Sequence, residues 1–398
     1  MIKINGKFDI NTGSIIPQNS LLAPLKSLYG NSNLSAGDCN SISENVLFFD
    51  IETTGFSAKH TLCYLIGCTF CKDGCWNYVQ WFLDVLSEEA DLIRAFLDFA
   101  SDYKYLIHFN GDGFDLPYLA ERCVSLGLEE NFDKFRNNIT SIDIFKAAKA
   151  VKELLKTDNY RQKTLEEFLG IYRKDAYSGG DLVKVYKDYI KQPDKNALDI
   201  LLLHNHDDIT ALPSLMPLLS YCAVPMYDRS YVSYSINAAI DYSGKPLTEL
   251  ILSLKLPSAV PIPVSYGKEP FYIRISDDSM KLRIRMHTGE LKYYYPNYKD
   301  YYYLPDEDKA LHKSVAAFVD PNHREQAKAE NCYMKKSGTF LPQMNELEMP
   351  RFKINYSDKY TFFEATDKFM KNNDKLTAYA DHVLKFMLPH IYNFTPFD

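Results

Sequence analysis

The sequence predicts an α/β domain at residues 46–222 and a second, β-rich α+β domain at residues 230–398. Three observations support this division. A short apolar run at residues 46–56 ends in a glycine turn, as is typical of a buried strand. Strand-like and helix-like patterns then alternate to about residue 219. Beyond the proline-containing stretch 221–233, short alternating strands dominate.

The strand predicted at residues 46–56 carries two acids. Asp50 and Glu52 are two positions apart, so strand alternation places both on one face. The apolar residues around them predict a central strand, where an uncompensated pair of carboxylates is costly. A bound cation is one explanation. The other is a strand end that opens into solvent, with both acids hydrated.

Composition narrows the class of protein. The chain has 398 residues, 46% of them hydrophobic, which is enough for packed cores and too long for one ordinary domain. The formal net charge is -7, with 22 Lys and Arg against 30 Asp and Glu up to Val224, and 23 against 22 beyond it. Net charge therefore does not indicate a nucleic-acid partner, and a basic binding surface would have to be local.

Targeting signals are not evident in the sequence. No uninterrupted run of 18 apolar residues occurs, and residues 1–29 lack a basic segment followed by an apolar core. We therefore expect a cytoplasmic protein that does not contact a membrane and whose eight cysteines are reduced. Residues 1–45 are interpreted as an N-terminal leader without chemistry of its own. The sequence does not specify the oligomeric state.

Two apolar runs, at residues 63–71 and 75–82, are joined by an Asp-Gly pair and predict a β-hairpin. The hairpin holds Cys63, Cys68, Cys71 and Cys75, and part of this spacing matches an iron-sulfur loop. A cluster needs an irregular loop that directs its thiolates to one point, whereas these cysteines follow a strand pattern. Buried thiols are thus the favoured interpretation, with a metal or iron-sulfur site as the alternative.

The remaining elements of the first domain alternate in type. We expect strands at residues 1–10, 103–110 and 139–144, and helices at residues 87–100 with Ser87 as N-cap, 115–126, 145–155, 163–169 and 195–219. Asp115 stands where a strand turns into a helix. Asp is a favoured N-cap, but ligands of open α/β sheets bind beyond the strand ends, so this residue can both cap and coordinate.

The helix at residues 195–219 carries a second polar pattern. His204 and Asp208 fall on the same stripe as the leucines that should face the core. An imidazole and a carboxylate four residues apart can form a self-satisfied buried pair or take part in catalysis. Four carboxylates now stand where an inward acid is costly, and oxygen ligands that carry a charge of -4 suit two divalent cations, Mg²⁺ or Mn²⁺. These carboxylates are Asp50, Glu52, Asp115 and Asp208.

At this point the sequence resembles the DEDD 3′–5′ exonucleases of the ribonuclease H-like superfamily. "FFDIETTG" is similar to their first motif, "HFNGDGFDLPYL" to the second and "HNHDDITAL" to the third. The pattern "NG..FD.P.L..R", the segment "KTLEEFLG" and the "HN..D" ending resemble the YprB-type branch. The resemblance covers roughly residues 45 to 220 and implies a mixed sheet flanked by helices.

One position departs from the family pattern. The branch that uses a histidine places it five residues before the last Asp, where this chain has Leu203. The branch that uses a tyrosine places it four residues before, where this chain has His204. His204 should therefore take the place of the tyrosine, and whether it acts as a general base or only orients the water stays open.

The resemblance implies a metal-dependent 3′–5′ exonuclease that acts on DNA or RNA by a two-metal-ion mechanism, with a single-stranded 3′ end as partner. It implies that Asp50 bridges both ions, that Glu52 and Asp208 hold the water-bearing ion, and that Asp115 holds the second. It also implies substrate contacts for four residues, namely Thr53, Thr54, Asn110 and Phe114, although the last two fit structural roles equally well. The alternatives are a nucleic-acid-binding module without turnover and, as above, a metal protein built on the Cys63–Cys75 hairpin.

The second domain is expected to begin with a meander. Strands are predicted at residues 271–276, 280–288 and 291–295, with turns at Asp277-Asp278 and Gly289, and helices are predicted within residues 361–387. The middle strand places Lys281, Arg283 and Arg285 on one face. The tyrosine-dense stretch 292–303 follows closely. This combination fits a nucleic-acid platform, or a half-solvated sheet whose rings cover the edge of the core.

Overall fold

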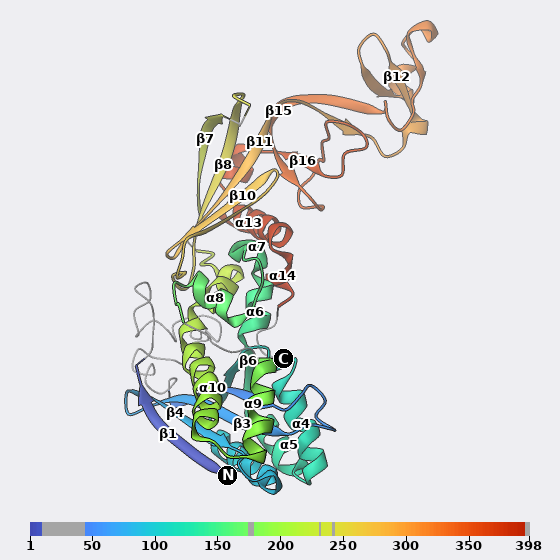
Figure 1. The fold of residues 1–398 in the computed structure, drawn as a ribbon. Coiled ribbons are helices and arrows are strands. Elements are labelled where there is room, and N and C mark those ends of the chain that lie inside the picture. Colours follow the sequence, from blue (N-terminus) through green and yellow to red (C-terminus); the bar gives the residue numbers. More distant parts are fainter. Residues whose placement is uncertain (10–43, 174–178, 231, 241–242, 395–398) are drawn as a thin grey trace. The chain divides into compact units, whose positions relative to one another are not determined.

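The computed structural model describes residues 1–9, 44–173, 179–230, 232–240 and 243–394. Within them the chain forms two compact units (Figure 1). Unit 1 consists mainly of Met1–Val224 with Pro257–Ile262, and unit 2 of Pro225–Leu256 and Pro263–Tyr392. Most of the leader expected at residues 1–45 lies outside the described residues. Each unit is considered by itself below.

Unit 1 is built on a mixed sheet, as the sequence predicted. Its described strands are β1 (Ile2–Phe8), β2 (Val46–Thr53), β3 (Cys63–Lys72), β4 (Cys75–Phe82), β5 (Tyr105–His108) and β6 (Thr140–Asp143). They lie in the order β1-β4-β3-β2-β5-β6. β2 pairs antiparallel with β3 and parallel with β5, so the strand with the paired acids lies inside the sheet. The β3–β4 hairpin turns at Asp73 and Gly74, both with positive φ.

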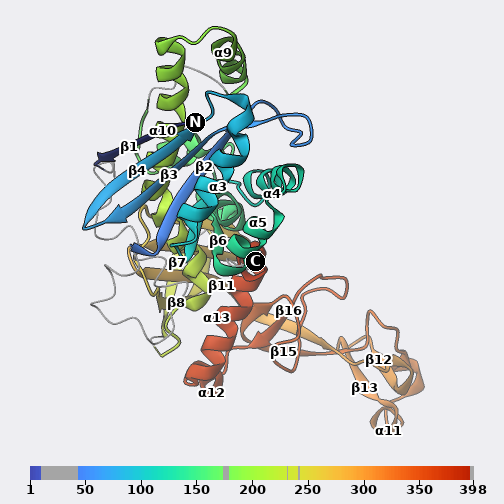
Figure 2. The same cartoon turned by 90° about the horizontal axis from the view of Figure 1, so that it is seen from below.

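Helices cover both faces of this sheet. They are α3 (Glu89–Ala100), α4 (Asp115–Leu126), α5 (Glu129–Asn138), α6 (Ile144–Ala150), α7 (Lys152–Leu155), α8 (Gln162–Phe168), α9 (Gly179–Lys191) and α10 (Lys195–Leu215). Phe49 of β2 stacks on Phe96 of α3, and the next residue, Asp50, accepts a hydrogen bond from Asn205 of α10. Since successive strand residues point to opposite faces, α3 and α10 cover opposite sides (Figures 1 and 2).

The helix predicted at residues 115–126 has the predicted bounds, whereas two expected N-caps are not observed. A 3-10 turn at Leu86–Glu88 precedes α3, so Ser87 is not its N-cap. Asp115 is the first residue of α4 and the cap position belongs to Phe114, whose side chain makes no capping bond. The Asp115 carboxylate instead accepts the backbone N–H of Ile51 in β2. A contact distant in sequence therefore replaces the local capping bond that the Asp-Pro spacing suggested.

The hydroxyl of a buried threonine replaces a backbone hydrogen bond that Pro213 cannot make in α10. Proline has no N–H, so the carbonyl of Ile209, four residues earlier, cannot receive its usual helical hydrogen bond. The hydroxyl of Thr69 in β3 donates to this carbonyl over 3.0 Å, and both residues are fully buried. The helix then continues as a 3-10 helix over Met216–Met226. The proline thus ties α10 to the sheet without ending it.

The segment Lys195–Met226 is also long and apolar enough to cross a membrane, judged by length and composition. In its most apolar window 83% of the residues are buried within the protein. The core helix of a globular domain meets the same criterion, and α10 packs on β2, β3 and β4.

Unit 2 is β-rich, as expected, and its sheets are antiparallel. The larger sheet is formed by β7 (Ser233–Ile240), β8 (Pro246–Lys255), β9 (Val264–Lys268), β10 (Phe271–Ser276), β11 (Ser279–Tyr294), β15 (Tyr333–Gln343) and β16 (Thr361–Glu364). A small sheet contains β12 (Tyr301–Leu304), β13 (Lys309–His312) and β14 (Glu325–Gln326). The helices are α11 (Lys313–Ala316), α12 (Asp367–Met370), α13 (Asn373–Met387) and α14 (Pro389–Tyr392).

The turn predicted at Gly289 was wrong. β11 runs through this residue without a break, pairing with β8 and β10 before it and with β15 around it. Gly289 has a φ of 147° and lies opposite Gly338 in the β11–β15 register. Glycine inside a strand permits a bend or a close approach as readily as a turn, and the sequence does not distinguish these uses. The predicted helical stretch also begins with a strand, β16.

The cationic stripe on β11 is partly neutralised. Arg283 donates two or more hydrogen bonds to Glu249 of β8, and Arg285 forms an ion pair with Glu269 at 3.1 Å. Alternation placed these arginines on one face correctly, since Leu282 and Ile284 are buried on the other. The acids that pair with them lie on the neighbouring strand β8 and in the turn between β9 and β10, so the stripe is a weaker attractant for phosphates than its sequence suggests.

The repair of α10 by Thr69 can be tested directly. Thr69→Val keeps the side-chain shape but removes the donor to the Ile209 carbonyl, so we expect the free energy of unfolding to fall by about 1 to 3 kcal/mol. Urea denaturation measures this change. The matched control is Thr210→Val in α10. The hydroxyl of Thr210 donates to the carbonyl of His206, which can still accept its ordinary helical hydrogen bond when that hydroxyl is removed. Equal losses in the two variants would contradict the assigned role.

Candidate active site

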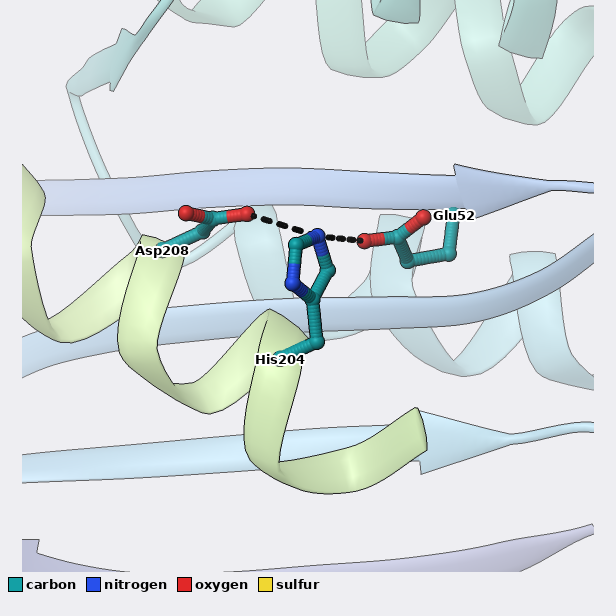
Figure 3. A group of neighbouring side chains, drawn as sticks. All are labelled: Glu52, His204 and Asp208. Carbon is teal, nitrogen blue, oxygen red and sulfur yellow. Dashed lines mark ion pairs between the residues drawn. The ribbon is translucent and has the colours of Figure 1, made fainter. Parts of the chain in front are cut away.

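The imidazole of His204 lies between two carboxylates from different elements. Its Nε2 atom is 3.5 Å from Oε1 of Glu52 at the end of β2 and 3.3 Å from Oδ2 of Asp208 in α10 (Figure 3). One ligand atom from each of the three residues lies within 4.8 Å of the other two, close enough to hold a metal ion. Leu203, the alternative position, is 59% exposed. The helical spacing had placed His204, and not its neighbour, beside Asp208.

Asp50 accepts a hydrogen bond from one side-chain amide, which is itself oriented by a second amide. Nδ2 of Asn205 donates to Oδ2 of Asp50 over 3.1 Å, and Nε2 of Gln80 donates to Oδ1 of Asn205 over 2.9 Å. This second bond fixes which way the Asn205 amide points. A Cβ atom on Gly67, which lies opposite Asp50 in β3, would come within 2.0 Å of Oδ1 of Asn205. Gly67 therefore lets α10 approach the sheet closely enough for this contact.

Asp115 joins the cluster from the strand-to-helix turn. Its Oδ1 atom accepts the N–H of Ile51, the residue between the two acids of β2. Asp115 is buried, with 5% of its surface exposed. The second motif is thereby fixed to the first through the backbone. Sequence reasoning identified Asp115 but not this bond, because it joins residues that are 64 positions apart.

The acids of the cluster raise one another's pKa. Burial, and then the charges of Asp115, Glu52 and Asp208, raises the pKa of Asp50 well above its usual range. Burial, Asp208 and Asp115 raise the pKa of Glu52 to about 8. Burial raises the pKa of Asp115 to about 6, although the nearby His108 opposes the shift. The carboxylates are thus crowded enough that they cannot all ionise without compensating positive charge.

The residues present fit divalent cations. Carboxylate oxygens are suitable ligands for Mg²⁺ or Mn²⁺, and crowded buried acids are what a bound cation would stabilise. Glu52, His204 and Asp208 are close enough to share one ion, whereas Asp50 and Asp115 lie outside that group of three. The donor set therefore supports a cation site at the end of β2 and does not specify which metal binds.

A cavity of about 760 Å³ adjoins Asp50 and Asp115. Phe114 and Asn110, both proposed from sequence as pocket residues, line it together with Phe56. Phe56 is 94% exposed, and its ring lies edge-to-face with that of Phe114 at a centroid distance of 6.1 Å. The exposed ring of Phe56, with the partly buried ring of Phe114 next to it, forms a surface on which a planar group can stack.

Thr53 and Thr54 have local structural roles in the loop after β2. The hydroxyl of Thr53 donates to the Gly55 carbonyl over 3.0 Å. The hydroxyl of Thr54 accepts the N–H of Leu62 over 2.9 Å, and its backbone N–H donates to the carbonyl of the same residue. Neither residue belongs to the lining of the cavity. Their side chains therefore shape the loop, and a substrate contact would have to use the backbone, as the sequence resemblance implied.

A second cluster supports the turn before Asp115. The N–H of Gly111 donates to Nδ1 of His108, which leaves Nε2 to carry the hydrogen toward Ser141 at 2.7 Å. Ser141 donates to Asp112 over 2.6 Å, and Lys146 donates to the other oxygen of Asp112 over 2.8 Å. Burial would raise the pKa of Asp112, but the hydrogen bonds from His108, Lys146 and Ser141 lower it below its usual range. These bonds satisfy the cluster internally.

The cysteine alternative gains no support from the described part of the chain. Cys63 and Cys68 are buried in β3, whereas Cys75 is exposed at the start of β4. Neither group of potential metal ligands found among the described residues contains a cysteine. A regular strand directs successive side chains apart, which is the physical reason why this spacing does not form a cluster here.

The fold and the site together define an α/β domain with an acidic centre at the end of a central strand. Residues 47–220 match the family model described as the RNase_H superfamily. This segment is therefore a ribonuclease H-like domain, in agreement with the motifs in the sequence.

The individual proteins that this chain resembles match it either over a short stretch or at low sequence identity. A stretch of 44 residues is 41% identical to DNA polymerase 1 of Sulfurisphaera ohwakuensis and covers 11% of this chain and 5% of the polymerase. The family B DNA polymerase from Pyrobaculum calidifontis is 14% identical, with a TM-score of 0.36, over 62% of this chain and 33% of the polymerase. E. coli exonuclease I in complex with a dA16 oligonucleotide is 10% identical, with a TM-score of 0.27, over 54% of this chain and 55% of the exonuclease. The chain thus spans only part of each of these proteins.

The Asp112 network predicts a pH dependence of stability. Its pKa is lowered in the folded state, so its contribution is present above the unfolded pKa and is lost as the pH falls through the folded pKa. We expect Asp112→Asn to lower the free energy of unfolding by about 1 to 3 kcal/mol at pH 7. The difference from wild type should shrink below about pH 4, measured by urea denaturation across pH.

Asp98→Asn, on the exposed side of α3, provides the control and should change stability little at either pH. A pH-independent loss in Asp112→Asn would show that packing, and not the charge of Asp112, supplies the stability.

Proposed function

We propose that unit 1 is a metal-dependent 3′–5′ exonuclease of the DEDD type that hydrolyses phosphodiester bonds of DNA or RNA. The observation that carries the proposal is the convergence of the three motifs. Glu52 of the first motif contacts His204, His204 contacts Asp208 of the third, and Asp115 of the second is bonded to the backbone beside Glu52. A ribonuclease H-like domain with these acids is best explained as a nuclease.

The four acids would hold two divalent cations, Mg²⁺ or Mn²⁺. When bound, such ions supply a nucleophilic hydroxide near neutral pH and stabilise the leaving oxygen. Glu52 and Asp208, together with His204, form the group that is close enough to share one ion. Asp50 is electrostatically coupled both to this group and to Asp115, since burial and then the charges of Asp115, Glu52 and Asp208 raise its pKa. This position suits the bridging role.

His204 would orient the attacking water and receive its proton. Its Nε2 atom faces the cluster, while Glu52 and Asp208 hold the ring from either side. A positioned imidazole is the side chain that most often serves as a general base.

The cavity beside Asp50 and Asp115 would receive the terminal nucleotide. Phe56 and Phe114 offer rings for a base, and Asn110 adds a polar side chain. Every base has an aromatic face, so stacking of this kind tolerates different sequences. A single-stranded end fits such a cavity because its bases are already unpaired.

The proposal predicts cleavage that depends on metal and on the acids. Purified protein incubated with 5′-labelled single-stranded DNA or RNA should give a ladder that shortens from the 3′ end with Mn²⁺ and not with EDTA. Asp50→Ala and Asp208→Ala should each reduce the rate by at least about a hundredfold, because each removes a proposed metal ligand. Gel electrophoresis of the products measures both effects.

Asp207→Ala is the matched control. Asp207 is the sequence neighbour of Asp208, but its Oδ1 atom contacts Nδ1 of His206 over 3.4 Å and not the residues of the site. Wild-type rates in Asp50→Ala and Asp208→Ala would refute the metal site. Retained binding to the strand without any cleavage would favour the binding module.

For unit 2 we propose a single-strand contact at the tyrosine-dense stretch. A hollow of about 390 Å³ is lined by Tyr294, Tyr295, Tyr298 and Tyr356, with Arg351 and Lys353 beside them. Tyr298 is 38% exposed and Tyr356 is 46% exposed, so both rings can reach a ligand. Aromatic rings next to cationic side chains are suited to a base and its phosphate.

Removing these rings should weaken binding of single-stranded oligonucleotides. Base stacking contributes about 1 to 3 kcal/mol per base, so we expect Tyr298→Ala combined with Tyr356→Ala to raise Kd about fivefold or more. Fluorescence anisotropy with labelled DNA in EDTA measures Kd without cleavage. Tyr234→Ala is the control, because Tyr234 is a 40% exposed tyrosine on β7, outside the hollow. An unchanged Kd in the double variant would assign the tyrosines to packing.

A further inference from the structure

Arg173 bridges a buried glutamate and an acid of the candidate site. Its Nε atom donates to Oε2 of Glu166 over 2.7 Å, and its Nη2 atom is 2.6 Å from Oδ1 of Asp208. Glu166, in α8, has no exposed surface, while the side chains of Arg173 and Asp208 are 16% and 20% exposed.

The two carboxylate oxygens of Asp208 contact different side chains. Oδ1 faces Arg173, whereas Oδ2 lies 3.3 Å from His204 and faces the group that can share a metal ion. A carboxylate held by one oxygen cannot rotate freely, so the direction of the other oxygen is fixed as well. Gln162 of the same helix as Glu166 donates to the backbone carbonyl of Asp208 over 3.1 Å. Both the backbone and the side chain of Asp208 are thus held from the side of α8.

Glu166 keeps Arg173 in place. A fully buried carboxylate without its partner is strongly destabilising, so Arg173 is expected to stay paired with Glu166 whether or not a cation binds nearby. The guanidinium is planar and always charged, and its separate N–H groups can serve two carboxylates at once. A lysine has a single ammonium on a flexible chain and could not reproduce this geometry.

We propose that Arg173 is a positioning residue of the nuclease site, which is anchored on Glu166, holds Oδ1 of Asp208 and thereby directs Oδ2 toward a divalent cation. This inference rests on the proposed function, because it assigns Asp208 to the metal site. Arg173 acts through Asp208 and need not touch the substrate. Loss of such supporting contacts around a metal ligand typically lowers metal affinity about tenfold to a hundredfold.

The experiment measures Mn²⁺ binding in the absence of nucleic acid, by isothermal titration calorimetry on the full chain. Wild type is compared with Arg173→Gln, Arg173→Lys and the double variant Glu166→Gln with Arg173→Gln. The double variant leaves no buried charge behind, so it stays informative if Arg173→Gln fails to fold. Arg94→Gln is the matched control, because Arg94 pairs with Asp91 at 2.7 Å on the exposed side of α3.

We expect Kd for Mn²⁺ to rise about tenfold or more in Arg173→Gln and in the double variant, and to stay unchanged in Arg94→Gln. Arg173→Lys should recover little of the loss, since it keeps the charge but not the bridge. In cleavage assays the same variants should need more Mn²⁺ for half-maximal rate. The rate at saturating Mn²⁺ should change less than the Mn²⁺ requirement.

Three results would overturn the proposal. Unchanged Mn²⁺ affinity in the folded variants would reduce Arg173 to a structural ion pair. Tighter Mn²⁺ binding would mean that Arg173 competes with the cation for Asp208, and full recovery in Arg173→Lys would mean that charge alone matters. Because binding is measured without substrate, a wild type that binds Mn²⁺ but cleaves nothing refutes the exonuclease and leaves this inference standing.

Discussion

Crowding of carboxylates at one end of a buried strand is the constraint on which unit 1 depends. Like charges that share a desolvated site repel each other strongly, and each acid loses its hydration. The protein offsets part of this cost with specific donors: Asn205 for Asp50, the backbone N–H of Ile51 for Asp115, and Tyr64 for Glu52. Burial, and then the charge of the neighbouring acids, raises the pKa of both Asp50 and Glu52.

The contact of Asn205 with Asp50, and the approach of His204 and Asp208 to Glu52, require α10 to lie at one height on the sheet. Apolar packing alone tolerates small shifts of a helix, because leucines contact many neighbours in similar ways. Here, Gln80 donates to the carbonyl of Leu202 and Thr69 donates to that of Ile209, so two points seven residues apart are fixed on the same face. Gly67 removes the side chain that would keep the helix away. Polar contacts therefore set the register that brings His204 and Asp208 to Glu52.

Unit 2 is built around one long strand, β11. This strand joins sheet partners on both sides of Gly289, and the two arginines on its outer face pair with acids on β8 and in the turn between β9 and β10. The tyrosines of the dense stretch 292–303 are divided in the structure: Tyr301–Leu304 form β12 of the small sheet, whereas Tyr294, Tyr295 and Tyr298 line the hollow. The hydroxyl of Tyr303 donates a hydrogen bond to Asp308. Local sequence density thus overstates how much of the row is available to a ligand.

The sequence by itself determined the features that depend on local periodicity. Alternation placed Asp50 and Glu52 on one face of β2, and helical spacing selected His204 instead of Leu203 as the partner of Asp208. Only the tertiary structure decided which residues support them. Gly67 leaves space for Asn205, Thr69 donates to the carbonyl of Ile209, and Arg173 contacts both Glu166 and Asp208. These contacts join separate elements, so they depend on strand order and helix docking, which a periodic pattern within one segment does not encode.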